Sequence, residues 1–348
     1  MRDGGAIAAG AHVRQRALII FGVAVSLALL AYTLRDVSVA ELLEHLGHAN
    51  LWLLLAATAA ATLTFALRAI RWRILLLPVA GELSFRSRFA TVCIGFMANN
   101  VVGARVGEFA RGYSLTRIEP VGLSPVIASL VVERLLDGIV TVGLLIPAYL
   151  VIGPERLASA GPLVEILTGF LIIVGIGIVV ASAMVWLPGR LLALADKLTT
   201  RLPEKFTERL IGVLESFIDG LGVLRKWRIL VAAFLWSVVV WVWNAFSFYL
   251  GLLAFDIVEP GFTGSMLLQS IISLFVAIPS TPGFFGPFEF GARVCLELYG
   301  IDPSLIVSFA ASYHILTFLP VTLIGIWYMR ALGIKRSDIT NRGEAAES

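Results

Sequence analysis

The sequence predicts an all-α, polytopic membrane protein with about six transmembrane helices and two re-entrant, broken-helix hairpins arranged as an inverted repeat. Three observations predict this fold class. Of the 348 residues, 58% are hydrophobic and 15% are charged, whereas soluble domains are nearer half apolar and a quarter charged. The Lys and Arg residues gather in alternate loops between the apolar segments. Two further apolar segments are interrupted by glycine or proline.

Six segments are expected to cross the membrane. A hydrocarbon core of about 30 Å requires roughly 20 apolar residues in a helix. Five of the six segments contain no Lys or Arg, and Glu165 is the only acidic residue in these five. The first segment is interpreted as an uncleaved signal anchor, because its apolar core is long and no A-x-A-like site precedes Arg35. The expected spans are 17–34, 51–67, 124–152, 163–187, 229–253 and 304–329.

The basic residues of the connecting segments predict the orientation. Twenty Lys and Arg lie in the N-terminal segment, in 68–88, in 188–228 and from residue 330 onwards, whereas the opposite loops hold only Arg35 and Arg156. Cytoplasmic loops carry the excess of Lys and Arg, so a multi-pass protein of the cell (plasma or inner) membrane with both termini cytoplasmic is predicted. The terminal segments would be a cytoplasmic N-terminus, 1–16, and a cytoplasmic tail, 330–348.

Two segments, 89–120 and 264–300, are apolar enough to enter the membrane but are broken in the middle. Each half is too short to span, which predicts two re-entrant hairpins. Irregular backbone at membrane depth is tolerated only where it is buried in protein or lines a wet cavity, so each break indicates an internal site. The long loop 188–228 has apolar residues at helical spacing over 210–221 and is predicted to contain an amphipathic helix on the cytoplasmic leaflet.

The two halves of the chain resemble each other. The stretch GARVGEFAR (103–111) parallels GFFGPFEFGAR (283–293), because in both, glycines lead into a Glu and then an Arg. Each half is ordered helix, helix, hairpin, helix, and its three crossings would insert the second half upside down. Inverted repeats with broken helices near the midplane are a recurrent transporter plan. The predicted repeats are 17–152 and 163–329.

Charged residues within the expected spans are the main candidates for a functional site. Glu133 and Asp137 lie one turn apart on one helix face, and Arg134 is three residues from Asp137. A charge at a helix centre costs at least about 2.5–3.5 kcal/mol, so these groups need partners, which are expected among the hairpin charges. Ion pairs that only set the helix register are the alternative. The candidate substrate-binding and transport residues are Asn99, Asn100, Arg105, Glu108, Arg111, Glu133, Arg134, Asp137, Pro282, Gly283, Gly286, Glu289, Arg293 and His314.

A basic cluster, Arg68, Arg71 and Arg73, follows the second expected span. It reflects either the positive-inside rule alone or attraction of anionic lipid head groups, to which each basic residue near the surface contributes about 1 kcal/mol. The two cysteines, Cys93 and Cys295, lie far apart and form no CxxC pair, and neither a metal nor a cofactor is expected.

Four motifs occur in order along nearly the whole chain: RAIRWRILL (68–76), GARVGEFARGYSL (103–115), VVERLLDG (131–138) and PSTPGFFGPFEFG (279–291). Together they resemble the flippase-like transmembrane domain of the lysylphosphatidylglycerol synthase family. The resemblance implies a membrane protein that moves a lipid, or a lipid-linked head group, between leaflets. The chain departs from the family pattern at Val102, where Pro is common, and at His314, where Arg is common. The soluble aminoacyl-transferase domain of the full-length synthases is absent from the 348 residues, so synthase activity is not expected.

The leading functional hypothesis is a flippase-like transporter for an anionic or isoprenoid-linked lipid. Arginines of the site would meet an acidic head group, and Glu108, Asp137 and Glu289 would hold them in place or take up a coupling proton. A gradient-driven permease for a small polar solute is the alternative, followed by a lipid-linked membrane transferase and a scaffold. No catalytic constellation or Walker A motif is present, so an enzyme is not expected. Membrane lipids are the expected partners, a lipid-modifying enzyme is a candidate partner, nucleic acid is not expected, and the oligomeric state is open.

Overall fold

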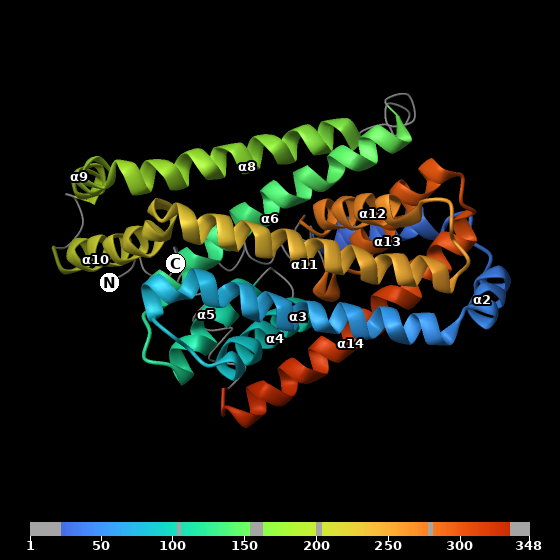
Figure 1. The fold of residues 1–348 in the computed structure, drawn as a ribbon, viewed down its shortest axis with the longest axis horizontal. Coiled ribbons are helices and arrows are strands. Elements are labelled where there is room, and N and C mark those ends of the chain that lie inside the picture. Colours follow the sequence, from blue (N-terminus) through green and yellow to red (C-terminus); the bar gives the residue numbers. More distant parts are fainter. Residues whose placement is uncertain (1–21, 103–105, 154–162, 200–203, 278–280, 335–348) are drawn as a thin grey trace, which may run out of the picture.

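The computed structural model describes residues 22–102, 106–153, 163–199, 204–277 and 281–334, and all regular elements in these ranges are helices (Figure 1). In chain order these elements are a helix over Gly22–Leu34, α2 (Val39–His48), α3 (Leu51–Ala80), α4 (Phe85–Val101), α5 (Gly107–Ile118), α6 (Leu123–Ile152), α8 (Leu163–Trp186), α9 (Pro188–Thr199), α10 (Glu204–Gly220), η1 (Leu221–Arg225), α11 (Trp227–Ala254), α12 (Gly261–Val276), η2 (Pro282–Phe284), α13 (Pro287–Leu296), η3 (Glu297–Tyr299) and α14 (Pro303–Ala331).

Local sequence signals set the ends of several long helices. The Asn50 side chain accepts the N–H groups of Trp52 and Leu53, at 3.0 and 3.2 Å, and so caps the N-terminus of α3. Gly81 ends the same helix with a φ of 68°, a value that glycine adopts without steric cost. Asp302 caps α14 through two backbone N–H groups. Polar residues therefore fix where these two apolar helices begin.

Among the described residues, four helices are long and apolar enough to cross a membrane: α3, the Thr168–Trp186 part of α8, α11 and α14. The helix Gly22–Leu34 and α2 make a fifth span only if they are counted together, and they meet at 80°. α6 has 30 residues but carries three charged side chains near its middle. The structure thus supports a polytopic, all-helical membrane protein, and the number of six crossings stays a prediction.

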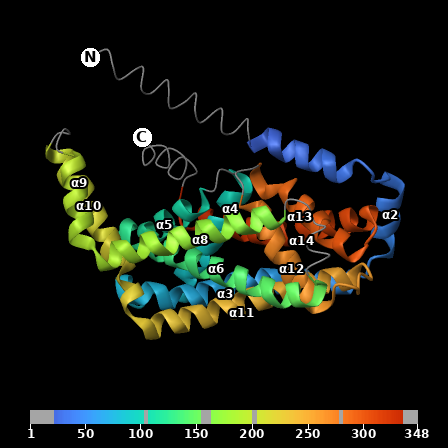
Figure 2. The ribbon, with the colours of Figure 1, turned by 90° about the horizontal axis from the view of Figure 1, so that it is seen from above.

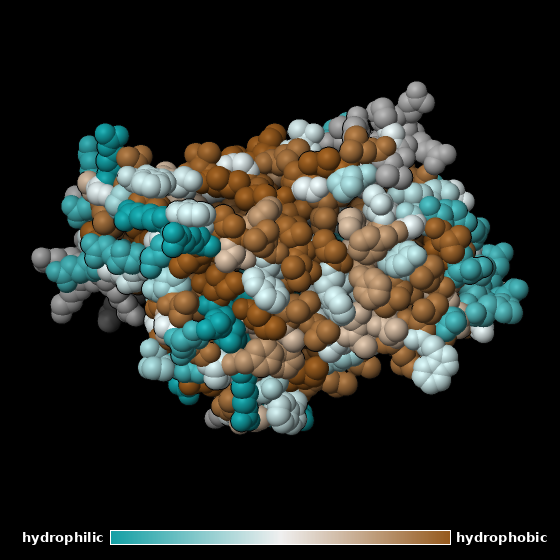
Figure 3. Space-filling view, viewed as in Figure 1, coloured by the Kyte–Doolittle hydropathy of each residue, from teal (hydrophilic) through white to brown (hydrophobic). Residues whose placement is uncertain are grey.

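The surface of the molecule is organised along its long axis. The helices α3, α8 and α11 run in this direction (Figure 1). On the face drawn in Figure 3, apolar side chains fill a band across the middle and polar side chains gather toward the two ends. Such a band is what a bilayer perpendicular to the long axis requires. Figure 2 shows α9 and α10 at one end, turned away from the direction of α8.

α3 continues well beyond the predicted span 51–67 and ends only at Ala80. The extension includes Arg71, which is 0% exposed and pairs with Glu133 and Asp137 of α6. The predicted end of the span was wrong because these carboxylates hold the arginine inside the protein, where the sequence pattern had indicated a loop at the membrane surface.

Both predicted hairpins are pairs of helices packed on each other. α4 and α5 form the first hairpin, and α12 and α13 form the second. In Figure 1 the first pair lies toward the end of the molecule where α3 ends and α6 begins, and the second pair lies toward the opposite end. η2, in the turn of the second hairpin, contacts α4 of the first. The two hairpins therefore meet inside the molecule.

The helices of one half pack on helices of the other half in a symmetric pattern, as an inverted repeat predicts. α3 packs on α11, its counterpart in the other half. α4 packs on α14, and α12 packs correspondingly on α6. Each hairpin thus lies against the last long helix of the opposite half. The repeat boundaries and the inverted orientation stay predictions that this packing supports.

The segment 188–228, in which an amphipathic helix is predicted, consists of three elements in its described parts: α9, α10 and η1. α10 packs on α6, where a Cβ atom on Gly220 would lie 2.7 Å from the Ala128 Cβ. α10 (Glu204–Gly220) covers most of the apolar positions, 210–221, on which the prediction of an amphipathic helix rests. Its position on the cytoplasmic leaflet stays a prediction.

The inverted repeat predicts that the two hairpin turns are reached from opposite sides of the membrane. Asn100→Cys and Thr281→Cys should therefore react with a membrane-impermeant maleimide from opposite sides, one in intact cells and the other only after permeabilisation. Cys93 and Cys295 are buried and 0% exposed, so the native thiols give little background. Labelling of both positions from the same side would contradict the inverted orientation.

Candidate functional site

Seven charged side chains from three helices meet in one place, which we call the charge cluster. α6 contributes Glu133, Arg134 and Asp137, and these lie within about one turn of helix. α3 contributes two arginines and α5 contributes one acid and one arginine. The remaining members are Arg68, Arg71, Glu108 and Arg111.

Arg71 lies at the centre of the charge cluster. Its guanidinium pairs with Glu133 at 2.9 Å, forms a second pair with Asp137, and donates to the Ser237 Oγ atom at 2.9 Å. Asp137 also accepts the indole N–H of Trp241 at 2.9 Å. Glu133 and Asp137 are one turn apart on α6, so the guanidinium fork of a single arginine reaches both carboxylates.

Arg111 closes the inner side of the cluster. It donates two hydrogen bonds to Glu133, at 2.8 and 3.1 Å, in a bidentate pair. Its guanidinium lies 3.7 Å from the ring centroid of Trp72, a cation–π distance. The Trp72 indole N–H in turn donates to Ser129 at 3.0 Å. This part of the cluster is a rigid, buried wall.

The outer side of the cluster is accessible. Arg134 pairs with Glu108 at 2.8 Å, and these two side chains are 45% and 36% exposed. Arg68 is 12% exposed, lies 3.5 Å from Asp137 and has its guanidinium 5.4 Å from the Phe96 ring centroid. The Arg134–Glu108 pair, which joins α6 to the first hairpin, is therefore where a ligand can reach the cluster.

The cluster carries an excess of positive charge. It holds four arginines, Arg68, Arg71, Arg111 and Arg134, against three carboxylates. Buried charges are stable only when they are paired, because desolvation costs several kcal/mol for each ion. Since the inner pairs are closed, the excess charge is available at the accessible side, where an anion would balance it.

A second polar group lies at the turn of the second hairpin. The His314 Nδ1 atom of α14 lies 2.7 Å from Glu289, and the other carboxylate oxygen of Glu289 accepts the Gly286 N–H at 2.7 Å. The imidazole stacks on Phe288, with a centroid distance of 4.1 Å. Gly286 has a φ of 98°, which requires glycine. Glu289 thus ties the start of α13 to α14.

Arg293, one turn further along α13, belongs to a third group. It pairs with Asp36 at 3.1 Å and with Glu297 at 2.7 Å, and it donates to the Thr33 carbonyl at 2.6 Å. Hydrogen bonds from Arg35 and then from Arg293 hold the pKa of Asp36 below its usual value. This group fastens the end of the helix Gly22–Leu34 to the second hairpin.

The partners that were expected among the hairpin charges come from the first hairpin, and Glu289 and Arg293 of the second hairpin pair elsewhere. Among the described residues, no ion pair joins either of them to the charge cluster. The two hairpins approach from opposite ends of the molecule, and α13 directs its charges to α14 and to the N-terminal helix instead.

Other predicted site residues have structural contacts at the hairpin turns. The Asn99 side chain accepts the Gly107 N–H at 2.7 Å, which closes the first hairpin, and Asn100 donates to Thr322 of α14 at 2.8 Å. Pro282 and Gly283, with a φ of 73°, form η2. Arg105 lies outside the described residues.

The three arginines that were predicted to attract lipid head groups, Arg68, Arg71 and Arg73, lie in different environments. Arg73 is exposed and pairs with Glu82, which keeps the pKa of the Glu82 carboxyl below its usual value. Surface attraction therefore stays a proposal for Arg73. For Arg71 the prediction of surface attraction was wrong, because its side chain is buried in the charge cluster. The sequence reasoning also missed Ser237 and Trp241 of α11, whose spacing of four residues puts both on the face toward α6.

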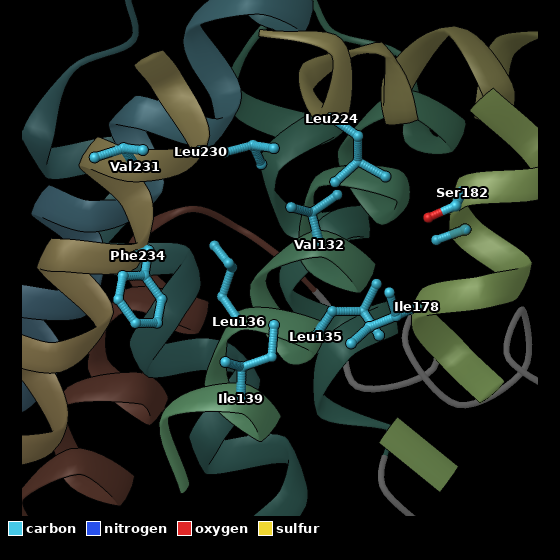
Figure 4. Close-up of a pocket in the computed structure, with 11 residues that line it drawn as sticks. Val132, Leu135, Leu136, Ile139, Ile178, Ser182, Leu224, Leu230, Val231 and Phe234 are labelled. Carbon is cyan, nitrogen blue, oxygen red and sulfur yellow. The ribbon is translucent and has the colours of Figure 1, made fainter. Parts of the chain in front are cut away.

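Two apolar grooves lie near these elements. The larger, of about 280 Å³, lies between α6, α8, η1 and α11, with side chains of all four pointing into it (Figure 4). The smaller, of about 210 Å³, lies between α4 and α14 beside the turn of the first hairpin and is lined by Val101, Met97 and Arg330, among others. Both combine apolar walls with basic residues at or near one end.

Residues 19–325 match the family model described as the lysylphosphatidylglycerol synthase TM region. The chain belongs to this family. The match covers all the elements of the charge cluster and both hairpins. The lysylphosphatidylglycerol synthase TM family is one of lipid-related membrane proteins, so the chain is a multi-pass membrane protein of this kind. No solved structure matches the chain.

Three relatives lie in archaea. The chain is 25% identical to glycosyltransferase AglD of Haloferax volcanii, over 93% of this chain but only 56% of that protein. It is 25% identical to a UPF0104 membrane protein of Methanothermobacter thermautotrophicus, over 75% of this chain and 77% of the relative. A UPF0104 membrane protein of Methanocaldococcus jannaschii is 21% identical, over 79% and 82%.

The AglD similarity corrects one expectation. The prediction that the protein is not an enzyme is contradicted, because a relative that bears the name of a transferase is similar along nearly the whole chain. The prediction rested on the lack of a recognisable catalytic constellation in the sequence.

Proposed function

We propose that the protein binds an anionic or isoprenoid-linked lipid at the charge cluster and moves it between the membrane leaflets. The observation that supports this most is the excess arginine of the cluster, with Arg134 accessible at its edge. Guanidinium groups bind phosphate through paired, charge-assisted hydrogen bonds. A lipid phosphate or another acidic head group has the charge that would neutralise the cluster, while its chains stay in the bilayer.

The exchange of partners at Arg134 is the step that would couple binding to movement. An anionic head group competes with Glu108 for the Arg134 guanidinium, and its binding separates α6 from α5 at this point. The inner pairs of Arg71 and Arg111 keep α3, α6 and the hairpin base together meanwhile. The Glu108 end of α5 can then move relative to this anchored part, as the broken helices of transporters do.

A lipid-linked transferase is the second candidate, because of the similarity to AglD. In that case the charge cluster would hold the lipid as the acceptor or donor of a transferred group. A polar-solute permease would use the same accessible arginine without moving lipid.

Leaflet exchange in proteoliposomes distinguishes these functions. We expect the purified full chain to accelerate exchange of an anionic head-group-labelled lipid, and Arg134→Gln to slow it about tenfold or more, the effect of losing one charge-assisted hydrogen bond. Glu108→Gln should alter the exchange, because it removes the competitor for Arg134. The matched control is Arg35→Gln, an exposed arginine paired with an aspartate outside the cluster, which should leave the rate unchanged.

The absence of lipid exchange, or an equal loss of exchange in Arg35→Gln, would rule out the flippase proposal. The same vesicles, supplied with nucleotide-activated sugars and lipid phosphates, report the transferase through formation of a glycolipid.

A further inference from the structure

We propose that the groove between α6, α8, η1 and α11 is a second lipid site, separate from the charge cluster, which binds one hydrocarbon chain of an anionic lipid. The groove has a volume of about 280 Å³, close to the lower end of the roughly 300–1,000 Å³ of small-molecule pockets. Ten of its eleven lining residues are apolar, and Ser182 is the exception. Figure 4 shows these side chains facing one another across the groove.

Close contacts between the surrounding helices fix the distance between the walls of the groove. A Cβ atom on Gly138 would lie 2.9 Å from Val174, and one on Gly177 would lie 2.9 Å from Leu135, so α6 and α8 approach closely at two glycines. At the other side Arg225 of η1 donates to the Val185 carbonyl of α8. The backbone is therefore anchored on both sides of the groove. Its volume is a consequence of this geometry.

The depth of the groove fits a chain from one leaflet. The wall on α6 runs from Val132 to Ile139, which is about 10 Å at 1.5 Å per residue. Half of a hydrocarbon core of about 30 Å is longer than this, so the groove is short enough to fit within one leaflet. Ile139, Val231 and Phe234 line it and are 38%, 47% and 36% exposed. It opens on the apolar surface, where a hydrocarbon chain is the available occupant.

The charge at one end of the groove favours an anionic head group. Two lining residues, Leu224 and Leu230, flank a stretch of chain that holds Lys226 and Arg228. Both are exposed, and neither is in an ion pair with an acidic side chain of the described residues. Between them, Trp227 is 67% exposed, as is typical of the membrane interface. A lipid with its chain in the groove has its head group at this level.

The test is photocrosslinking of the full chain in nanodiscs. Phosphatidylglycerol and phosphatidylcholine with the same diazirine-bearing acyl chain are compared, and the labelled residues are identified by mass spectrometry. We expect the anionic lipid to label Ile178 and Phe234 about fivefold more than the zwitterionic lipid, the ratio that one basic residue near the surface gives. Ile173, 68% exposed on the same α8, should show no such preference.

Two sets of variants complete the test. Ser182→Phe fills the groove and should abolish preferential labelling of its walls, whereas Ile173→Phe, on the exposed surface of α8, should not. Lys226→Gln with Arg228→Gln keeps the groove and should remove the preference for the anionic lipid. Equal labelling of the groove and of Ile173 by both lipids would show ordinary bilayer contact only and would overturn the proposal. Because binding is measured without leaflet exchange, this result is independent of the proposed flippase activity.

Discussion

Arg71→Met should lower the free energy of unfolding by about 3–5 kcal/mol, the cost of leaving buried carboxylates without their central partner. Arg71 is 0% exposed and binds Glu133, Asp137 and Ser237, so its loss leaves acceptors that water cannot reach. Chemical denaturation of the purified protein in detergent, followed by circular dichroism, measures the change. We expect the variant also to lose leaflet exchange, because the fixed wall behind Arg134 is gone.

Two further variants show whether the effect belongs to the buried pair. Arg73→Met removes an arginine that also pairs with a glutamate but is 54% exposed, and we expect little change. The double variant Arg71→Met with Asp137→Leu should recover part of the loss, because removal of both partners leaves fewer unpaired charges. If Arg71→Met were no more destabilising than Arg73→Met, the charge cluster would not be the structural centre of the fold.

Gly325→Val should destabilise the protein by about 1–3 kcal/mol or more through overpacking. A Cβ atom at Gly325 would lie 2.4 Å from the Met97 Cβ and 2.5 Å from the Cys93 carbonyl oxygen. One of these is backbone, which cannot rotate away, so α4 and α14 must separate. Their separation also strains the Asn100–Thr322 hydrogen bond, at 2.8 Å, at the base of the first hairpin turn. Thermal unfolding in detergent, together with the exchange assay, measures both consequences.

Gly143→Ala is the matched control for this prediction. Gly143 lies within α6, and no atom lies within 4 Å of a Cβ built on it. Alanine is the better helix former, by up to about 1 kcal/mol, so this variant should be neutral or more stable. A similar loss in both variants would show that the close α4–α14 approach is not required.

Much of the fold was predictable from the sequence because a bilayer imposes simple rules. The segment 229–253 differs from the observed α11 by only a few residues, since hydrophobic length is set by membrane thickness. The helix pairs at 89–120 and 264–300 were predictable because glycine and proline divide each apolar segment into two halves that are too short to span a membrane. The end of α3 was not, because the sequence pattern of basic residues is the same whether an arginine lies at an interface or pairs inside.

The charged residues of the site could be recognised from the sequence, but their ion-pair partners could not. Glu133, Arg134 and Asp137 were recognisable from their cost in an apolar helix. Their partners Arg71 and Arg111 come from separate helices, 62 and 22 residues from Glu133 in the chain. Nothing local specifies which of several arginines will reach a given carboxylate. The same is true of Glu289, which was expected in the cluster and binds His314 instead.

A helical membrane protein with two broken apolar segments, and with charged residues inside apolar segments, was predictable from the amino-acid sequence alone. These properties depend on composition and on spacing along one helix. The structure was needed to show that the charges divide into three groups, that one group has an excess arginine at an accessible edge, and that an apolar groove lies beside α6. Ion pairing and groove shape depend on distances between helices that are remote in the chain, and helix packing sets those distances.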